Sequence, residues 1–154
     1  MNVALIAVVA TAAIHGVWGC IIVTKAVTSR RDEYEAFSEK KKAWLIRLEN
    51  DLPTDSLLTV TYYDEVGKLI DNKTSGMLCG DENVETFRKV LFDSTGFSCP
   101  VKQGEYRAVR EHEYDDDTCG KISDMVEGRT DFIDINIREN YGGELIVVSV
   151  KLRK

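Results

Sequence analysis

Basic side chains are in the minority in this sequence. It carries 20 lysines and arginines against 26 aspartates and glutamates, which gives a formal net charge of −6. Binding to the phosphates of a nucleic acid requires a clustered basic surface. The single basic run, Lys40-Lys41-Lys42, is flanked by acidic residues and is explained by a solvated helix face. We therefore expect no nucleic-acid partner.

The sequence also lacks the short motifs of common enzyme classes. It contains no Gly-x-Ser-x-Gly, no His-Glu-x-x-His, no phosphate-binding loop and no dinucleotide fingerprint. His112 lies between two glutamates, but no nucleophile is placed near it. The acidic run 111–117 lacks the spaced ligands and the glycine of a calcium-binding EF-hand loop, so an exposed acidic loop explains it. We expect neither an enzyme nor a bound cofactor.

Cysteines are few, and their spacing does not suit a metal. The four are Cys20, Cys79, Cys99 and Cys119, no two of them are two residues apart, and His112 is the one imidazole near them. A zinc site is therefore not expected. If all four are oxidised, three pairings are open. We favour a bridge from Cys79 to Cys99, whose loop of about 20 residues would contribute ~3 kcal/mol. The pairing of Cys20 and Cys119 stays open.

Charged residues are missing from the first 24 positions, and residues 3–24 are apolar or small. One interpretation is a secretory signal peptide cleaved before Cys20, which places the protein outside the cell or in an endomembrane lumen. The alternative is a membrane anchor, since a span needs ~20 such residues. Lys25 and the arginines after it would then place the rest of the chain in the cytoplasm, where thiols stay reduced. We favour cleavage, and Asn72 in Asn72-Lys73-Thr74 is then a glycosylation candidate.

Hydrophobic periodicity predicts the elements after residue 24. A helix is expected over 29–50, within a helical segment and linker at 25–56, because apolar residues recur there at helical spacing and Pro53 ends the pattern. A β domain is expected over 57–154. Its elements are a strand over 57–63, a weaker strand from Leu69, a short helix after Cys79, and a hairpin of strands over 132–138 and 145–151. The helix is capped by Asp81 or Asn83, and Gly96 ends it.

The segment from Ser98 to Tyr106 is the most distinctive in the chain. In it Pro100 blocks helix, and Gly104 permits the turn that leads into a strand at Tyr106. Together with Cys79, the short helix and the closing hairpin, this Cys-Pro unit resembles the ML (MD-2-related lipid-recognition) domain, in particular its GM2-activator-like members. The resemblance covers about residues 57–154.

The resemblance implies an immunoglobulin-like β-sandwich whose two sheets hold lipid acyl chains between them. It also implies the Cys79–Cys99 bridge. We therefore expect a mainly β fold with an N-terminal helix and one short internal helix. The apolar rows of the predicted strands are the lipid-cavity candidates: Leu58, Val60, Tyr62, Ile133, Ile135, Ile137, Ile146, Val148 and Val150.

Two functional hypotheses follow. The first is a secreted or lumenal lipid-binding or lipid-transfer protein whose partner is a lipid or other apolar ligand. The second is a single-pass accessory protein, in which residues 3–24 span a membrane, 29–50 form a helical stalk, and the β domain contacts a larger membrane complex.

Overall fold

The chain forms a mainly β fold with two α-helices, each of which follows the preceding strand after a short connection. The computed structural model describes residues 19–29, 34–39, 43–64, 66–126 and 132–153. Most of the predicted signal peptide or anchor therefore lies outside the described residues. The elements are β1 (Cys20–Ser29), β2 (Tyr34–Glu39), β3 (Ala43–Leu48), β4 (Leu57–Tyr63), β5 (Leu69–Met77), η1 (Glu82–Val84), α2 (Glu85–Thr95), β6 (Gly104–Val109), β7 (Glu111–Tyr114), α3 (Asp116–Val126), β8 (Phe132–Arg138) and β9 (Glu144–Arg153).

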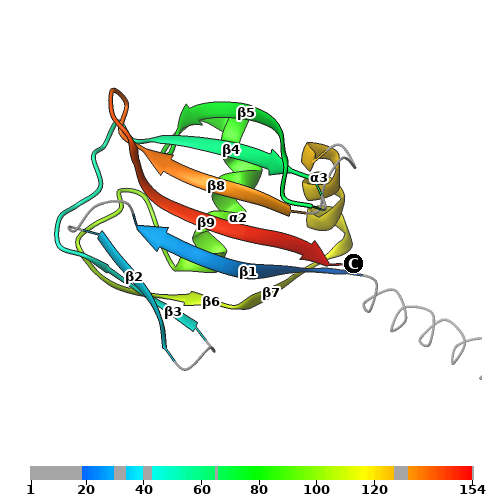
Figure 1. Cartoon of the computed structure of the whole chain (residues 1–154), viewed down its shortest axis with the longest axis horizontal. Helices are drawn as coiled ribbons and strands as arrows, with labels where there is room; N and C mark the ends of the chain where they lie inside the picture. Colours follow the sequence, from blue (N-terminus) through cyan, green and yellow to red (C-terminus); the bar gives the residue numbers. More distant parts are fainter. Residues whose placement is uncertain (1–18, 30–33, 40–42, 65, 127–131, 154) are drawn as a thin grey trace, which may run out of the picture.

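The strands form two antiparallel sheets. A six-stranded sheet has the order β5-β4-β8-β9-β1-β7, and a three-stranded sheet has the order β2-β3-β6. The larger sheet curls, and α2 crosses one of its faces (Figure 1). The chain passes from the small sheet to the large one between β6 and β7. Thr24 of β1 makes two hydrogen bonds to this connection. Its amide donates to the Arg110 carbonyl at 2.7 Å, and its hydroxyl donates to the Val109 carbonyl at 3.0 Å. The predicted β-sandwich class is confirmed.

The predicted hairpin and internal helix are confirmed as well. Strands β8 and β9 pair along their length from Phe132↔Lys151 to Arg138↔Glu144. The Asp81 carboxylate accepts a hydrogen bond from the Asn83 amide at 2.9 Å and caps the turn η1 that leads into α2. Gly96 ends α2 in the left-handed conformation, with φ of 80°, which glycine adopts without a Cβ penalty.

The helix predicted over 29–50 is wrong. Residues 34–39 and 43–48 are the paired strands β2 and β3, and β3 also pairs with β6. The reason is that apolar residues in this segment also recur at every second position, which is the spacing of a strand and competes with the helical spacing. Ile46 and Leu48 face the core and are almost fully buried, and Trp44 packs against it, while Arg47 is exposed. Pairing within a sheet thus outweighs the helical spacing of four apolar residues.

The proposed boundaries at residues 24 and 57 also fail. Residues 20–24 begin β1, an interior strand of the six-stranded sheet, so a membrane span over 3–24 overlaps the folded domain, whereas a leader cleaved before Cys20 ends where β1 begins. Residues 25–56 contribute strands to both sheets and are not a separate helical segment. In the described part of the chain, no helix is long and apolar enough to cross a bilayer.

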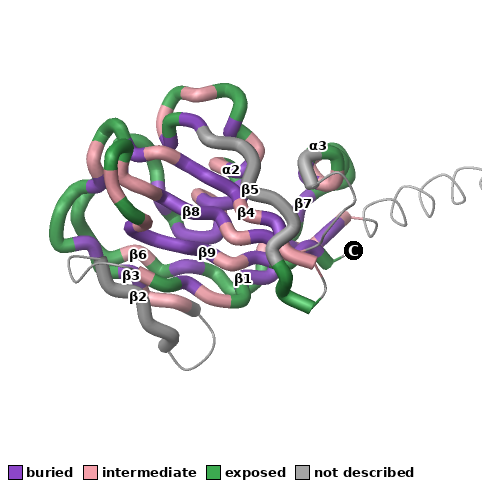
Figure 2. Tube along the Cα trace, turned by 45° about the horizontal axis from the view of Figure 1, so that its top comes forward, coloured by how far each residue is buried: buried purple, intermediate pink, exposed green. Residues whose placement is uncertain are grey.

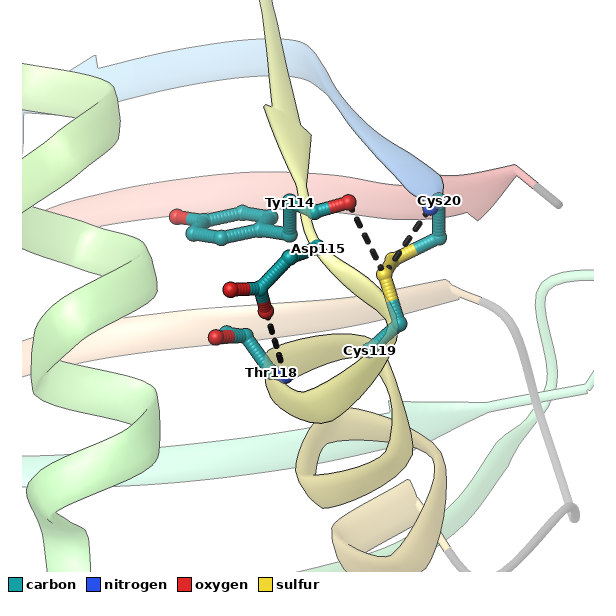
Figure 3. The surroundings of a disulfide bond; sticks show 5 residues. All are labelled: Cys20, Tyr114, Asp115, Thr118 and Cys119. Atoms are coloured by element: carbon teal, nitrogen blue, oxygen red, sulfur yellow. Dashed lines mark hydrogen bonds between the residues drawn. A yellow bond between two sulfur atoms is a disulfide. The ribbon is translucent and has the colours of Figure 1, made fainter. Parts of the chain in front are cut away.

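The acidic run 111–117 is not a loop. It holds strand β7 and the start of α3, a helix that the sequence analysis missed. The Asp115 carboxylate accepts a hydrogen bond from the Thr118 amide at 2.8 Å (Figure 3), and this bond holds the pKa of Asp115 below its usual value. Asp116 and Asp117 lie in the first turn, where negative charge suits the helix dipole. The run is therefore the end of a strand followed by the start of a helix.

Candidate ligand-binding site

The nine predicted cavity residues lie together on one face of the larger sheet. The strand register places them in three rows across β4, β8 and β9. Every one is buried, and much of β4, β8 and β9 is drawn as buried in Figure 2. The rows are Leu58–Ile137–Ile146, Val60–Ile135–Val148 and Tyr62–Ile133–Val150.

Helix α2 covers this face. Phe87 and Val90 of α2, with Ile122 of α3, line a small apolar space against Ile133 and Val150. The space has a volume of about 10 Å³, roughly the least that holds one water molecule. The predicted cavity residues therefore belong to the hydrophobic core, and the space beside Ile133 and Val150 is too small for an acyl chain.

A larger cleft of about 260 Å³ opens at the Cys-Pro unit. Three apolar side chains at the cleft, from Leu52, Leu78 and Val101, are each at most 4% exposed and belong to the hydrophobic core. Its exposed lining includes Thr54 and Pro100, and a cis peptide bond joins Cys99 to Pro100. We call this the disulfide cleft. Its lining residues are Leu52, Pro53, Thr54, Leu78, Cys79, Cys99, Pro100 and Val101.

The disulfide cleft lies where the ends of the two sheets meet. Residues 52–54 connect β3 of the small sheet to β4 of the large one, residues 78–79 follow β5, and residues 99–101 precede β6. Backbone hydrogen bonds join these three connections: the Leu52 amide donates to the Val101 carbonyl at 3.0 Å, and the Leu78 amide to the Ser56 carbonyl at 2.9 Å. The cleft thus opens from solvent onto the core that lies between the sheets.

One charged pair adjoins the cleft. The Asp51 carboxylate accepts a hydrogen bond from the Gln103 amide at 2.7 Å and pairs with the Lys102 ammonium at 3.4 Å. The backbone bond from Gln103, aided by the charge of Lys102, holds the pKa of Asp51 below its usual value. Because both groups are exposed, the ion pair contributes little stability, and the loop before β6 is joined to residues 51 and 52 by the hydrogen bonds of Gln103 and Val101.

All four cysteines are described, and they form two disulfides. Cys79 pairs with Cys99, as the resemblance implied, with Cα atoms 5.9 Å apart. Cys20 pairs with Cys119 and joins the start of β1 to α3, with Cα atoms 5.8 Å apart (Figure 3). Two disulfides are typical of proteins in an oxidising extracellular or lumenal environment.

The remaining candidate, Asn72, lies in β5, at an edge of the six-stranded sheet. Its backbone pairs with Thr61 of β4, and its side chain lies outside the described residues. Glycosylation of Asn72 stays a prediction.

Sequence reasoning missed most of the cleft. Cys79, Cys99 and Pro100 were singled out, but Leu52, Leu78 and Val101 lie in connections, where neither a helical nor a strand period marks them. One signal was present, because each apolar residue adjoins a proline or a cysteine that fixes the local chain.

No protein-family model, no curated protein and no solved structure matches this chain.

Proposed function

We propose that this chain is a secreted or lumenal protein that binds a lipid or another apolar ligand in the disulfide cleft. The observation that carries the proposal is that three side chains of the hydrophobic core line a cleft open to solvent. The lining as a whole is mainly apolar, with prolines and cysteines beside these three side chains, and it favours an apolar ligand because each buried methylene gains ~0.8 kcal/mol.

The size of the cleft limits the ligand. A volume of about 260 Å³ is near the lower end of small-molecule sites, which run from roughly 300 to 1,000 Å³. The cleft therefore accepts the end of one acyl chain or a single ring, and the polar part of the ligand stays in solvent. A fatty acid, whose carboxylate would stay in solvent, fits these limits.

The test uses the full chain produced through a secretory pathway. Purified protein is extracted with organic solvent and analysed by mass spectrometry, and it is titrated with a fluorescent fatty acid. We expect saturable uptake of the fatty acid. Protein that carries no lipid and takes up no fatty acid contradicts the proposal.

A matched pair of variants tests where the ligand binds. Thr54→Trp places a large ring at an exposed position that lines the cleft, while Asp55→Trp places the same ring on the next residue, which is also exposed but lies outside the lining. We expect Thr54→Trp to abolish uptake and Asp55→Trp to retain it. Unchanged uptake by Thr54→Trp contradicts the placement in the cleft.

A further inference from the structure

The two disulfides differ in their access to solvent. Cys99 is exposed and Cys79 partly exposed, and both line the disulfide cleft. Cys20 is only 4% exposed. Its partner Cys119 is partly exposed, and the Cys119 sulfur lies 2.9 Å from the Cys20 amide and 3.5 Å from the Tyr114 carbonyl (Figure 3). Cys99 is thus the one exposed cysteine of the four, and a thiol from solvent approaches its bridge more readily than the Cys20–Cys119 bridge.

We propose that Cys79–Cys99 is a thiol-exchange site and that Cys20–Cys119 is purely structural. A small-molecule thiolate enters the cleft and attacks the Cys99 sulfur. The new bond joins the incoming sulfur to Cys99, the Cys79–Cys99 bond breaks, and Cys79 leaves as a thiolate that takes a proton from water. The product is a mixed disulfide at Cys99 with a free thiol at Cys79. This inference rests on the geometry of the cleft and not on the proposed ligand.

The fold holds both sides of this bridge without help from the bond itself. On the Cys79 side, the Arg88 guanidinium donates to the carbonyls of Leu78 at 3.3 Å and Asp81 at 2.9 Å. On the Cys99 side, the Val101 carbonyl accepts from Leu52 and the Gln103 amide donates to Asp51. Helix α2, which lies between the two cysteines, is anchored in the core through its own buried residues. Exchange therefore yields a folded, modified protein.

The experiment follows exchange at each bridge in the full chain. The protein is incubated with reduced glutathione at about pH 8, where a substantial share of the thiol is thiolate. Samples are quenched with an alkylating reagent and the cysteine peptides are quantified by mass spectrometry. We expect Cys79 and Cys99 to react about tenfold faster than Cys20 and Cys119, because attack depends on access to the sulfur. Equal rates, or faster reaction of Cys20 and Cys119, overturn the proposal.

Two variants keep the test decisive. Thr54→Trp, which narrows the cleft, should slow exchange at Cys79–Cys99 and leave Cys20–Cys119 unchanged, whereas Asp55→Trp should alter neither. The double variant Cys79→Ala/Cys99→Ala should keep the far-ultraviolet circular dichroism spectrum of the parent. An unfolded double variant, or an unaffected rate in Thr54→Trp, contradicts exchange in the folded state. Failure of fatty-acid uptake leaves these outcomes untouched, so the two proposals fail separately.

Discussion

The Tyr114 hydroxyl on β7 donates a hydrogen bond of 2.9 Å to the Asp93 carboxylate on α2. Asp93 also pairs with Lys89, one helical turn earlier, at 3.2 Å. The Tyr114 ring, 7% exposed, packs against the core, and from β7 it points toward α2 (Figure 3). This bond therefore joins an edge strand of the large sheet to the helix that covers its face.

Removing that hydroxyl should destabilise the protein. Tyr114→Phe keeps the ring and loses the bond to a charged acceptor, so we expect the free energy of unfolding to fall by about 1–2 kcal/mol. Urea unfolding followed by circular dichroism measures this change. Tyr141→Phe, at a ring that is 98% exposed, is the matched control and should leave stability unchanged. A Tyr114→Phe variant as stable as the parent would show that the bond contributes nothing.

The same tyrosine predicts how stability depends on alkaline pH. Burial, with the hydrogen bond to Asp93 and the charge of Asp93 as further causes, raises the pKa of the Tyr114 phenol well above its ordinary value. The folded state therefore holds this proton more tightly than the unfolded state, whose phenol titrates near pH ~10. The contribution is complete below that pH and is lost as pH rises above it. The urea midpoint of the parent should fall more steeply above about pH 10 than that of Tyr114→Phe.

Ile135 marks the centre of the core. It is fully buried and pairs with Val60 on β4 and Val148 on β9. We expect Ile135→Ala to cost about 2–5 kcal/mol, because the removed methyl groups leave a cavity that a packed sheet cannot close. Val66→Ala, at a turn residue that is 90% exposed, should stay within about 0.5 kcal/mol of the parent in the same denaturant titration. Similar losses in the two variants would place Ile135 outside the core.

The two disulfides should differ in their contribution to stability. Cys20 and Cys119 are 99 residues apart in sequence, and Cys79 and Cys99 are 20 apart. In the chain-entropy model, the longer loop contributes about 4–5 kcal/mol and the shorter about 3. Thermal unfolding of the two double-alanine variants should therefore show the larger drop in midpoint for Cys20→Ala/Cys119→Ala. The reverse order would indicate that strain or residual unfolded structure outweighs loop entropy.

Much of the fold could be predicted from the alternation of apolar and polar residues in the sequence. The strand over 57–63 and the hairpin over 132–151 were predicted because apolar side chains at every second position must face one core. The bridge between Cys79 and Cys99 was anticipated as well. These features depend on local patterns or on a short span of chain.

The rest depends on tertiary pairing. Strands β2 and β3 acquire their conformation from each other and from β6, which lies more than fifty residues later in the sequence. Strand β1 was hidden in an apolar run because both of its neighbours, β9 and β7, are distant in sequence. The disulfide cleft was missed for the same reason, since its three connections meet only once the two sheets are assembled.

The order of the strands has a consequence for biosynthesis. Strands β8 and β9 occupy the middle of the six-stranded sheet, yet they follow every other strand in the sequence and lie outside both disulfide loops. During translation, the strand pairs β4–β5 and β1–β7 therefore keep unpaired edges until the last hairpin emerges and inserts between them. A chain that stops after Val126 would retain both covalent bridges and still lack a continuous sheet.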